Sequence, residues 1–129
     1  MGTYSFPKEE RLRKKEDFER ILKEGKVYYC PPIIVYINKK GERRRLGISV
    51  NKKVGSAVIR NRIKRLIREV YRLNRPYILD NVEILVIVKP NGKKIKNFAE
   101  MEKILKNIWK SANIFKDVKE DSCNINKNL

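Results

Sequence analysis

The chain of 129 residues contains no histidine. Histidine is the commonest general base and a frequent metal ligand, so catalytic dyads and triads that need an imidazole are excluded. The carboxylates offer no replacement, because Asp17, Glu42 and Glu69 are scattered rather than paired at a spacing typical of metal ligands. We therefore expect neither a catalytic residue nor a metal site in this chain.

Cysteine and long apolar runs are also scarce. The two cysteines, Cys30 and Cys123, lie far apart in the sequence, and a disulfide between them is disfavoured in a cytosolic protein. No run approaches the roughly 18 apolar residues of a membrane span, and no signal peptide opens the chain. These features predict a cytoplasmic protein with no membrane partner.

Acidic residues are few beside the basic ones, with 15 Asp and Glu against 32 Lys and Arg and a net charge of +17. Residues 1–72 hold 21 basic and 8 acidic residues, whereas residues 73–129 hold 11 and 7. Such an excess repels itself unless a polyanion neutralises it, and nucleic acid is the partner we expect. An anionic membrane is the weaker alternative, because the basic helix described below presents no Trp or Phe opposite its charges.

The length predicts a single domain over residues 1–129, with a core of about residues 8–116 and flexible ends at 1–7 and 117–129. Its elements are expected in the order helix, strands, helix, strand, helix, which indicates an α+β fold or a two-layer α/β sandwich. These elements are a helix within residues 9–26 that ends at Gly25, strands at 31–38 and 46–50 joined by a hairpin turn around Gly41, a helix at about 57–73, a central strand at 82–90, and a helix capped by Asn97.

Three apolar patterns locate the expected core. Phe18, Ile21 and Leu22 share one side of the first helix. Leu46, Ile48 and Val50 alternate with Gly47 and Ser49 along the second strand. The last helix carries a stripe made of Phe98, Met101, Leu105, Ile108 and Ala112.

The stretch RNRIKRLIREVYR, residues 60–72, combines a high basic charge with regular apolar spacing. On a wheel of about 100° per residue, one face is an apolar stripe for docking on a sheet. That stripe consists of Ile59, Ile63, Leu66, Ile67, Val70 and Leu73. The opposite face carries Arg60, Asn61, Lys64, Arg65, Arg68 and Arg72, and Arg62 lies on the flank.

Most charged faces are simply solvated, but these usually mix signs along the helix. Here like charges repeat at i,i+4, and only Glu69 offsets them. A chain that accepts this repulsion needs the face for an anion, so the helix predicts contact with nucleic acid.

The approach to this helix supplies a second signal, because Lys52 and Lys53 end a strand just before it. Gly55 and Ser56 then begin the helix, whose first turn favours phosphate. They are equally consistent with a turn residue and an N-cap. Their spacing does not match a nucleotide-binding loop, so no nucleotide cofactor is expected.

Two aromatic residues suggest which nucleic acid binds. Phe18 lies on a helix rich in Lys and Arg, and Tyr36 faces opposite to Val35 and Ile37 along its strand. Exposed aromatics on a basic surface stack the bases of a single strand. Burial of both rings in the core remains an open alternative.

The stretch KKVGSAVIRNRIKRLIREVYR closely resembles the signature of the bacterial ribonuclease P protein subunit. The hallmark of that signature is an Arg-Asn-Arg core, here Arg60, Asn61 and Arg62. RLRKKEDFERILKEG resembles the family's N-terminal helix, and LGISVNKK its strand before the signature. The resemblance spans roughly residues 11–110.

The resemblance implies a basic protein cofactor of a catalytic RNA that removes the 5′ leader of precursor tRNA. It implies that Mg²⁺ is held mainly by the RNA, and that the sheet is mainly antiparallel with a left-handed crossover. By position, the cleft for the single-stranded leader is lined by Phe18, Tyr36 and Ser49. The residues facing RNA are Lys52, Lys53, Arg60, Asn61, Arg62, Lys64, Arg65, Arg68 and Arg72.

Two positions depart from the family pattern. Leu22 stands where a second aromatic often follows, and Ser56 where Asn or a basic residue is common. Two other functions use the same basic helix, namely that of a ribosomal protein and that of a general RNA chaperone. A DNA-binding helix-turn-helix is disfavoured, because the strand LGISV occupies the place of its first helix.

Overall fold

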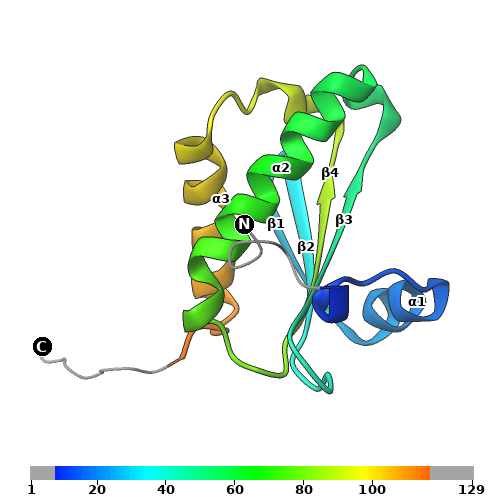
Figure 1. Ribbon diagram of the computed structural model, residues 1–129, viewed down its shortest axis with the longest axis vertical. Helices are drawn as coiled ribbons and strands as arrows, with labels where there is room; N and C mark the ends of the chain where they lie inside the picture. The colour runs from blue at the N-terminus through cyan, green and yellow to red at the C-terminus, as the bar shows by residue number, and fades with distance from the viewer. Residues whose placement is uncertain (1–7, 117–129) are drawn as a thin grey trace, which may run out of the picture.

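A computed structural model describes residues 8–116 of the chain (Figure 1). The helices are α1 (Lys15–Glu24), α2 (Ala57–Asn74) and α3 (Phe98–Ser111). The strands are β1 (Lys26–Cys30), β2 (Ile33–Asn38), β3 (Arg45–Val50) and β4 (Glu83–Val88). The short 3₁₀ helices are η2 (Lys8–Glu10), η3 (Lys52–Val54), η4 (Arg75–Tyr77) and η5 (Pro90–Lys94). The predicted flexible ends and Cys123 lie outside the described residues.

The four strands form one sheet in the order β1-β2-β4-β3. β1 with β2 and β2 with β4 are antiparallel, whereas β3 and β4 are parallel and are joined through α2. The predictions of an α+β fold and a mainly antiparallel sheet are therefore confirmed. The handedness of the β3-α2-β4 crossover stays a prediction.

β4 occupies the interior position that its continuous apolar run predicts. Ile84, Val86 and Val88 are fully buried on one face of the sheet. On the other face Leu85 is buried and Ile87 is half-buried. A strand apolar on both sides needs neighbours at both edges and cover on both faces, and β4 has β2 and β3 beside it.

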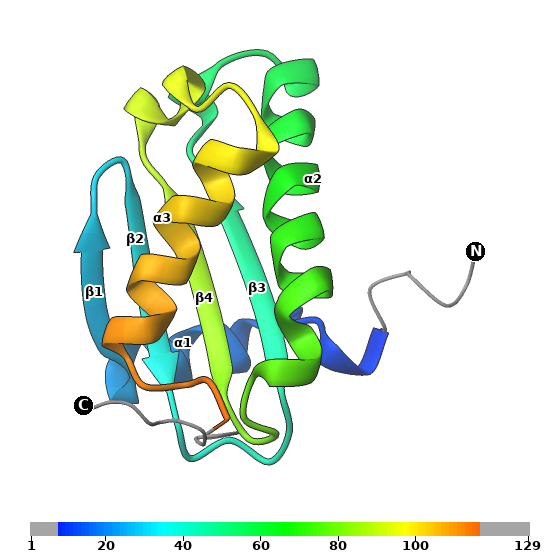
Figure 2. The same ribbon diagram turned by 90° about the vertical axis from the view of Figure 1, so that its left-hand side faces the viewer.

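The helices are divided between the two faces of the sheet. α2 and α3 cover one face and enclose the main core, as Figure 2 shows. α1 lies on the opposite face, at one end of the sheet, where Ile21 packs with Leu12 and Leu85. The expected α3 stripe is largely confirmed, because Met101, Leu105, Ile108 and Ala112 are buried and Phe98 is half-buried.

The predicted cap of α3 is present, because Asn97 Oδ1 accepts a hydrogen bond from Glu100 N at 3.0 Å. The Glu100 carboxylate accepts from Lys96 N at 2.9 Å, one residue before the cap.

Three expectations about the elements were wrong or incomplete. The predicted hairpin around Gly41 does not form, since β4 lies between β2 and β3. Gly41 N instead donates to Asn81 O at 3.0 Å, so this loop packs beside the start of β4. Leu22 is 46% exposed, because α1 docks through a narrower stripe than expected. β1 was not predicted at all.

Candidate nucleic-acid interface

α2 docks on the sheet through most of its predicted stripe, with Ile63, Ile67 and Val70 fully buried. Leu73, which the wheel also assigns to the stripe, is 47% exposed. Tyr71 is buried in its place, because it turns toward the segment that precedes α1. In the last turn of α2 the buried side therefore includes Tyr71 and Asn74 instead of Leu73.

The opposite face of α2 points to solvent, and we call it the α2 cationic face. Asn61, Arg65 and Arg68 are exposed, and Lys64 is half-buried. Within residues 8–116, none of these four side chains takes part in a hydrogen bond or ion pair. Their donors are thus available to an external anion, as the wheel predicts.

Arg60 and Arg62 are held in place by backbone carbonyls. Arg60 Nε donates to Gly55 O at 3.1 Å, and Arg62 Nη1 donates to Ile95 O and Lys96 O at 3.4 and 3.3 Å. A guanidinium carries five N–H donors, so both side chains are oriented and still have donors for phosphate. Arg62 also ties α2 to the loop that precedes α3.

Arg72 differs from the other cations of this face. Its Nε and Nη2 donate to the two carboxylate oxygens of Glu69 at 3.0 and 2.8 Å. The hydrogen bond from Arg72 lowers the pKa of Glu69, and this pairing offsets the charge that Arg72 offers to an anion. Of the predicted RNA-facing residues, Arg72 is the one least suited to that role.

The beginning of α2 has the predicted capping geometry. Ser56 Oγ accepts a hydrogen bond from Ile59 N at 3.4 Å, so Ser56 is the N-cap. Gly55 has a φ of 159°, which L side chains rarely adopt, and a Cβ there would also lie 2.9 Å from Ile59 Cδ1. Lys52 and Lys53 are exposed on η3 just before this cap. Phosphate contact at this position stays a prediction.

On the other side of the sheet, Phe18, Tyr36 and Ser49 share one face. Leu85 on β4 pairs with Tyr36 on β2 and with Gly47 on β3. Two residues further along β4, Ile87 pairs with Ser49. Phe18 packs over the sheet, where a Cβ at Gly47 would lie 3.0 Å from Phe18 Cε1. Phe18 and Tyr36 are both half-buried, so each ring combines core packing with an accessible side.

A further aromatic, Tyr29, was missed because β1 was not predicted. The register places Tyr29 opposite Ile34, and hence on the same face as Tyr36. Tyr29 is 69% exposed, and Ile34 is half-buried. The signal was the stretch KVYYC, which is β-branched and aromatic as strands prefer. We call this surface the open sheet face, defined by Phe18, Tyr29, Ile34, Tyr36, Ser49 and Ile87.

A network of charges closes the end of the open sheet face beneath α1. Arg20 contacts Glu83 at 2.6 Å and Asp17 at 3.1 Å. Arg45 contacts Asp17 at 3.3 Å, and Asn38 Nδ2 donates to Glu83 Oε1 at 3.0 Å. The five side chains come from α1 and from β2, β3 and β4. The network fixes α1 on the sheet and neutralises both carboxylates.

Residues 8–116 contain neither a cluster of metal-ligating side chains nor a helix able to span a membrane. No group of three or more Cys, Asp or Glu side chains is arranged to hold a metal ion in this part of the chain. Among its helices, none combines the length and the apolar character that crossing a membrane requires.

Comparisons with known proteins give one consistent result. The family model described as Ribonuclease P matches residues 6–113. The ribonuclease P protein component of Dictyoglomus turgidum is 61% identical over 119 residues, which cover 90% of this chain and 99% of that protein.

Solved structures agree. The Staphylococcus aureus RNase P protein, in a mutant form with defective mRNA degradation activity, matches with a TM-score of 0.75 at 37% identity, over 84% of this chain and 92% of that one. The Thermotoga maritima RNase P protein matches with a TM-score of 0.70 at 36% identity, over 79% and 96% of the two chains. The α+β fold is thus a shared feature, and the chain belongs to the ribonuclease P protein family.

Proposed function

We propose that this protein is the subunit of cytoplasmic ribonuclease P that binds the catalytic RNA and the single-stranded 5′ leader of precursor tRNA. It promotes the Mg²⁺-dependent endonucleolytic removal of the leader and so gives the mature 5′ end. The observation that carries this proposal is that one small fold presents two different RNA-suited surfaces, the α2 cationic face and the open sheet face.

The α2 cationic face suits the folded catalytic RNA. Its cations recur about every helical turn, so successive side chains reach successive phosphates along one line. Arg60 and Arg62 are oriented by carbonyl groups, whereas Arg65 and Arg68 are free to adapt within the described chain. Asn61 adds a donor and an acceptor among charges that only donate.

The open sheet face suits a single strand. Tyr29, Tyr36 and Phe18 offer aromatic faces on which unpaired bases stack irrespective of sequence. Ser49 is exposed in the same sheet and supplies a hydroxyl that both donates and accepts. Ile34 is half-buried and adds an apolar side chain to this surface.

Within residues 8–116, no group of carboxylates is arranged to hold a resident Mg²⁺. Asp17 and Glu83 are paired with Arg20 and Arg45, and Glu10 is paired with Arg75. Mg²⁺ requires oxygen ligands that are not already neutralised by guanidinium groups. We therefore assign Mg²⁺ to the RNA subunit, where it would activate water and stabilise the leaving oxygen. This chain contributes binding and orientation.

The test is to add the purified protein to bacterial ribonuclease P RNA and precursor tRNA at low Mg²⁺. We expect a rise in leader cleavage, since the protein neutralises phosphates that Mg²⁺ otherwise screens. A ribosomal protein or a general RNA chaperone would bind unrelated structured RNA equally well and leave cleavage unchanged. Unchanged cleavage together with equal binding of unrelated RNA would contradict the proposal.

A second arm tests where the chemistry lies. The protein without the RNA subunit is incubated with precursor tRNA and with an mRNA, since the Staphylococcus aureus relative is linked to mRNA degradation. We expect both RNAs to stay intact. Cleavage by the protein alone would contradict the assignment of the chemistry to the RNA.

A further inference from the structure

The segment that precedes α1 is fixed along the outer edge of β3. Arg11 forms a parallel bridge with Leu46, and Leu12 N donates to Leu46 O at 3.0 Å. Residues along this segment alternate between buried and exposed: Glu10 is 8% and Leu12 is 4% exposed, whereas Arg11 and Arg13 are exposed. Because Glu10 and Leu12 are buried, the alternating residues Arg11 and Arg13 are exposed to solvent.

Glu10 anchors this segment to the end of α2. Arg75 Nε donates to both carboxylate oxygens of Glu10 at 2.9 Å, and the Tyr71 hydroxyl donates to Glu10 Oε1. Burial alone would raise the pKa of Glu10, but the hydrogen bonds from Arg75 and Tyr71 outweigh it and lower the pKa. Glu10 therefore stays ionised at neutral pH, and the position of Arg11 beside it is fixed.

Between this segment and α2 lies a hollow of about 170 Å³. It is lined by Arg11, Leu12, Arg13, Leu46, Gly47, Ile48, Lys64 and Arg68, and we call it the β3-edge notch. Four of the eight lining residues are cations and none is a carboxylate. One water occupies roughly 30 Å³ of the liquid, so the notch has room for a phosphate with part of its hydration shell.

The backbone adds a donor to the same place. Leu46 directs its carbonyl group to the outer edge of β3, where it accepts from Leu12. Backbone groups alternate sides along a strand, so Ile48 directs its N–H to that edge too. An anion in the β3-edge notch meets this N–H together with the four cationic side chains.

No carboxylate lines the notch itself. Glu9 and Asp17 line a neighbouring hollow on the far side of Arg11 and Arg13. Asp17 is already paired within the network that ties α1 to the sheet. Glu9 is the exposed carboxylate of that neighbouring hollow.

We propose that the β3-edge notch binds one RNA phosphodiester, clamped between Arg11 and Arg13 on one side and Lys64 and Arg68 on the other. The proposal rests on the proposed function and names a contact site within it. The notch lies where the α2 cationic face meets the open sheet face, at the edge of β3. A phosphate bound there fixes an RNA strand at the boundary of the two surfaces, and Arg11 and Arg13 become RNA-binding residues.

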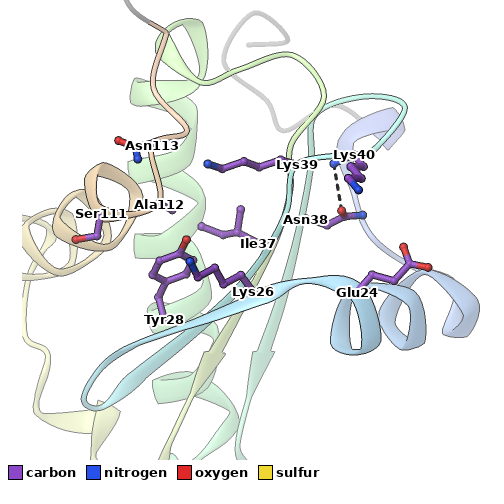
Figure 3. A pocket seen from close by; sticks show the side chains of 10 residues that line it. All are labelled: Glu24, Lys26, Tyr28, Ile37, Asn38, Lys39, Lys40, Ser111, Ala112 and Asn113. Atoms are coloured by element: carbon purple, nitrogen blue, oxygen red, sulfur yellow. Dashed lines mark hydrogen bonds between the residues drawn. The ribbon is translucent and has the colours of Figure 1, made fainter.

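A larger basic pocket of about 420 Å³ gives a matched control. It is lined by Lys26, Lys39, Lys40 and Tyr28, among others, and it lies at the C-terminal end of α3. In Figure 3, Lys39 extends across this pocket toward Asn113. The negative end of a helix dipole attracts cations, and Glu24 also lines the pocket, so its lysines are offset locally.

The experiment is a double-mutant cycle with Arg13→Ala, Arg68→Ala and the double variant. Two affinities are measured over a range of salt concentrations, that of the protein for the catalytic RNA and that of the protein–RNA complex for precursor tRNA. We expect each single substitution to weaken one of these affinities about tenfold and to lower its salt slope by about 1. The double variant should lose less than the product of the single losses, because both side chains contact the same phosphate.

The affinity that changes identifies whether the phosphate belongs to the catalytic RNA or to precursor tRNA. Lys39→Ala removes the same charge from the other pocket and should leave both affinities within about twofold. Independent losses at Arg13 and Arg68, an equal loss at Lys39, or no loss at Arg13 would each overturn the proposal. Thermal melts check folding, and Arg13→Glu repeats the test with a reversed charge.

These outcomes are separable from failure of the proposed function. If wild-type protein stimulates cleavage at low Mg²⁺ while the cycle shows no coupling, only the notch assignment is lost. If wild-type protein gives no stimulation, the proposed function is lost first.

Discussion

Asn61 is the uncharged residue at the centre of the α2 cationic face. It is exposed, and within residues 8–116 its amide has no hydrogen-bond partner. Arg60 and Arg62 on either side are anchored to backbone carbonyls, so the helix holds Asn61 in a defined position. The Asn61 amide can donate and accept hydrogen bonds at the same time, whereas contact with a phosphate requires only a donor.

Replacing Asn61 with Ala should weaken binding of the catalytic RNA roughly 5- to 10-fold, as expected for loss of one or two hydrogen bonds. The salt dependence should stay unchanged, because no charge is lost. Filter binding at several salt concentrations measures both quantities. Arg65→Ala is the matched control, since it should lower the affinity and also flatten the salt slope. Normal affinity in a folded Asn61→Ala protein would remove Asn61 from the interface.

Tyr29 is the most exposed aromatic of the open sheet face. Its replacement by Ala should weaken binding of precursor tRNA by roughly 5- to 100-fold, the range for loss of one stacked base. Binding of mature tRNA, which has no leader, should not change. Tyr29→Phe keeps the ring and should retain the affinity. Equal losses for precursor and mature tRNA would contradict a role in leader binding.

At the scale of elements, α1 and the segment before it are held by a small apolar cluster together with polar anchors. The buried cluster under α1 is small, consisting of Leu12, Ile21 and Leu85. The Asp17–Arg20–Glu83 contacts and the Glu10–Arg75 pair supply the remaining links. These links position the two sides of the open sheet face and of the β3-edge notch.

The Glu10 anchor has a defined pH dependence. Its folded-state pKa lies below the ordinary value, so its stabilisation is present above the unfolded pKa and is lost as pH falls through the folded pKa. Glu10→Gln should lower the free energy of unfolding at pH 7 by roughly 1.5–3 kcal/mol. We expect a loss at the lower end of this range, because the Arg75 side chain is 36% exposed and solvent partly screens its charge.

Urea unfolding at pH 7 and at acid pH measures this effect, and the difference from wild type should shrink in acid. Glu9→Gln, one residue earlier and exposed, is the control and should have little effect. A difference that persists unchanged in acid would show that the carboxylate charge of Glu10 is not what holds the segment.

Local sequence patterns predicted some helices and strands well and missed others. α2 and the central strand β4 were predictable, because a 3.6-residue stripe and a continuous apolar run each specify their surroundings. The pairing of β2 with β4 rather than with β3 was not, since strand order depends on distant contacts. β1 was not predicted from the sequence, because Lys26 and the exposed Tyr29 interrupt the apolar alternation expected of a strand.

The same limit applies to the candidate site. The wheel predicted the α2 cationic face, and the family resemblance implied that Tyr36 and Ser49 line one cleft. The contribution of Arg11 and Arg13 was not predictable, because the bridge to Leu46 joins residues far apart in the sequence. Nor did the pattern show which of the α2 cations are paired, as Arg72 is with Glu69.

For the whole molecule, the two RNA-suited surfaces lie on different sides of one sheet. α2 covers one face, and the open sheet face is the other. The sheet between them is continuously paired, so we expect each surface to bind without rearranging the other. The net charge of +17 serves both through long-range attraction of RNA.

This arrangement predicts separable effects. Arg65→Ala should change affinity for the catalytic RNA but not the ratio of precursor to mature tRNA binding by the complex. Tyr29→Ala should change that ratio but not the affinity for the catalytic RNA. In the combined variant, each of these two changes should stay within about 0.5 kcal/mol of its value in the single variant, as for distant sites. Strong coupling between these substitutions would indicate that one RNA contacts both surfaces.

The placement of β4 between β2 and β3 has a consequence for synthesis. The ribosome releases β1, β2, β3 and then α2 before the strand that completes the sheet. Until residues 83–88 emerge, β2 and β3 have no shared neighbour, and the apolar stripe of α2 has no finished platform. We therefore expect α2 to leave the exit tunnel as a basic, undocked segment that acquires its final position only after β4 has been translated.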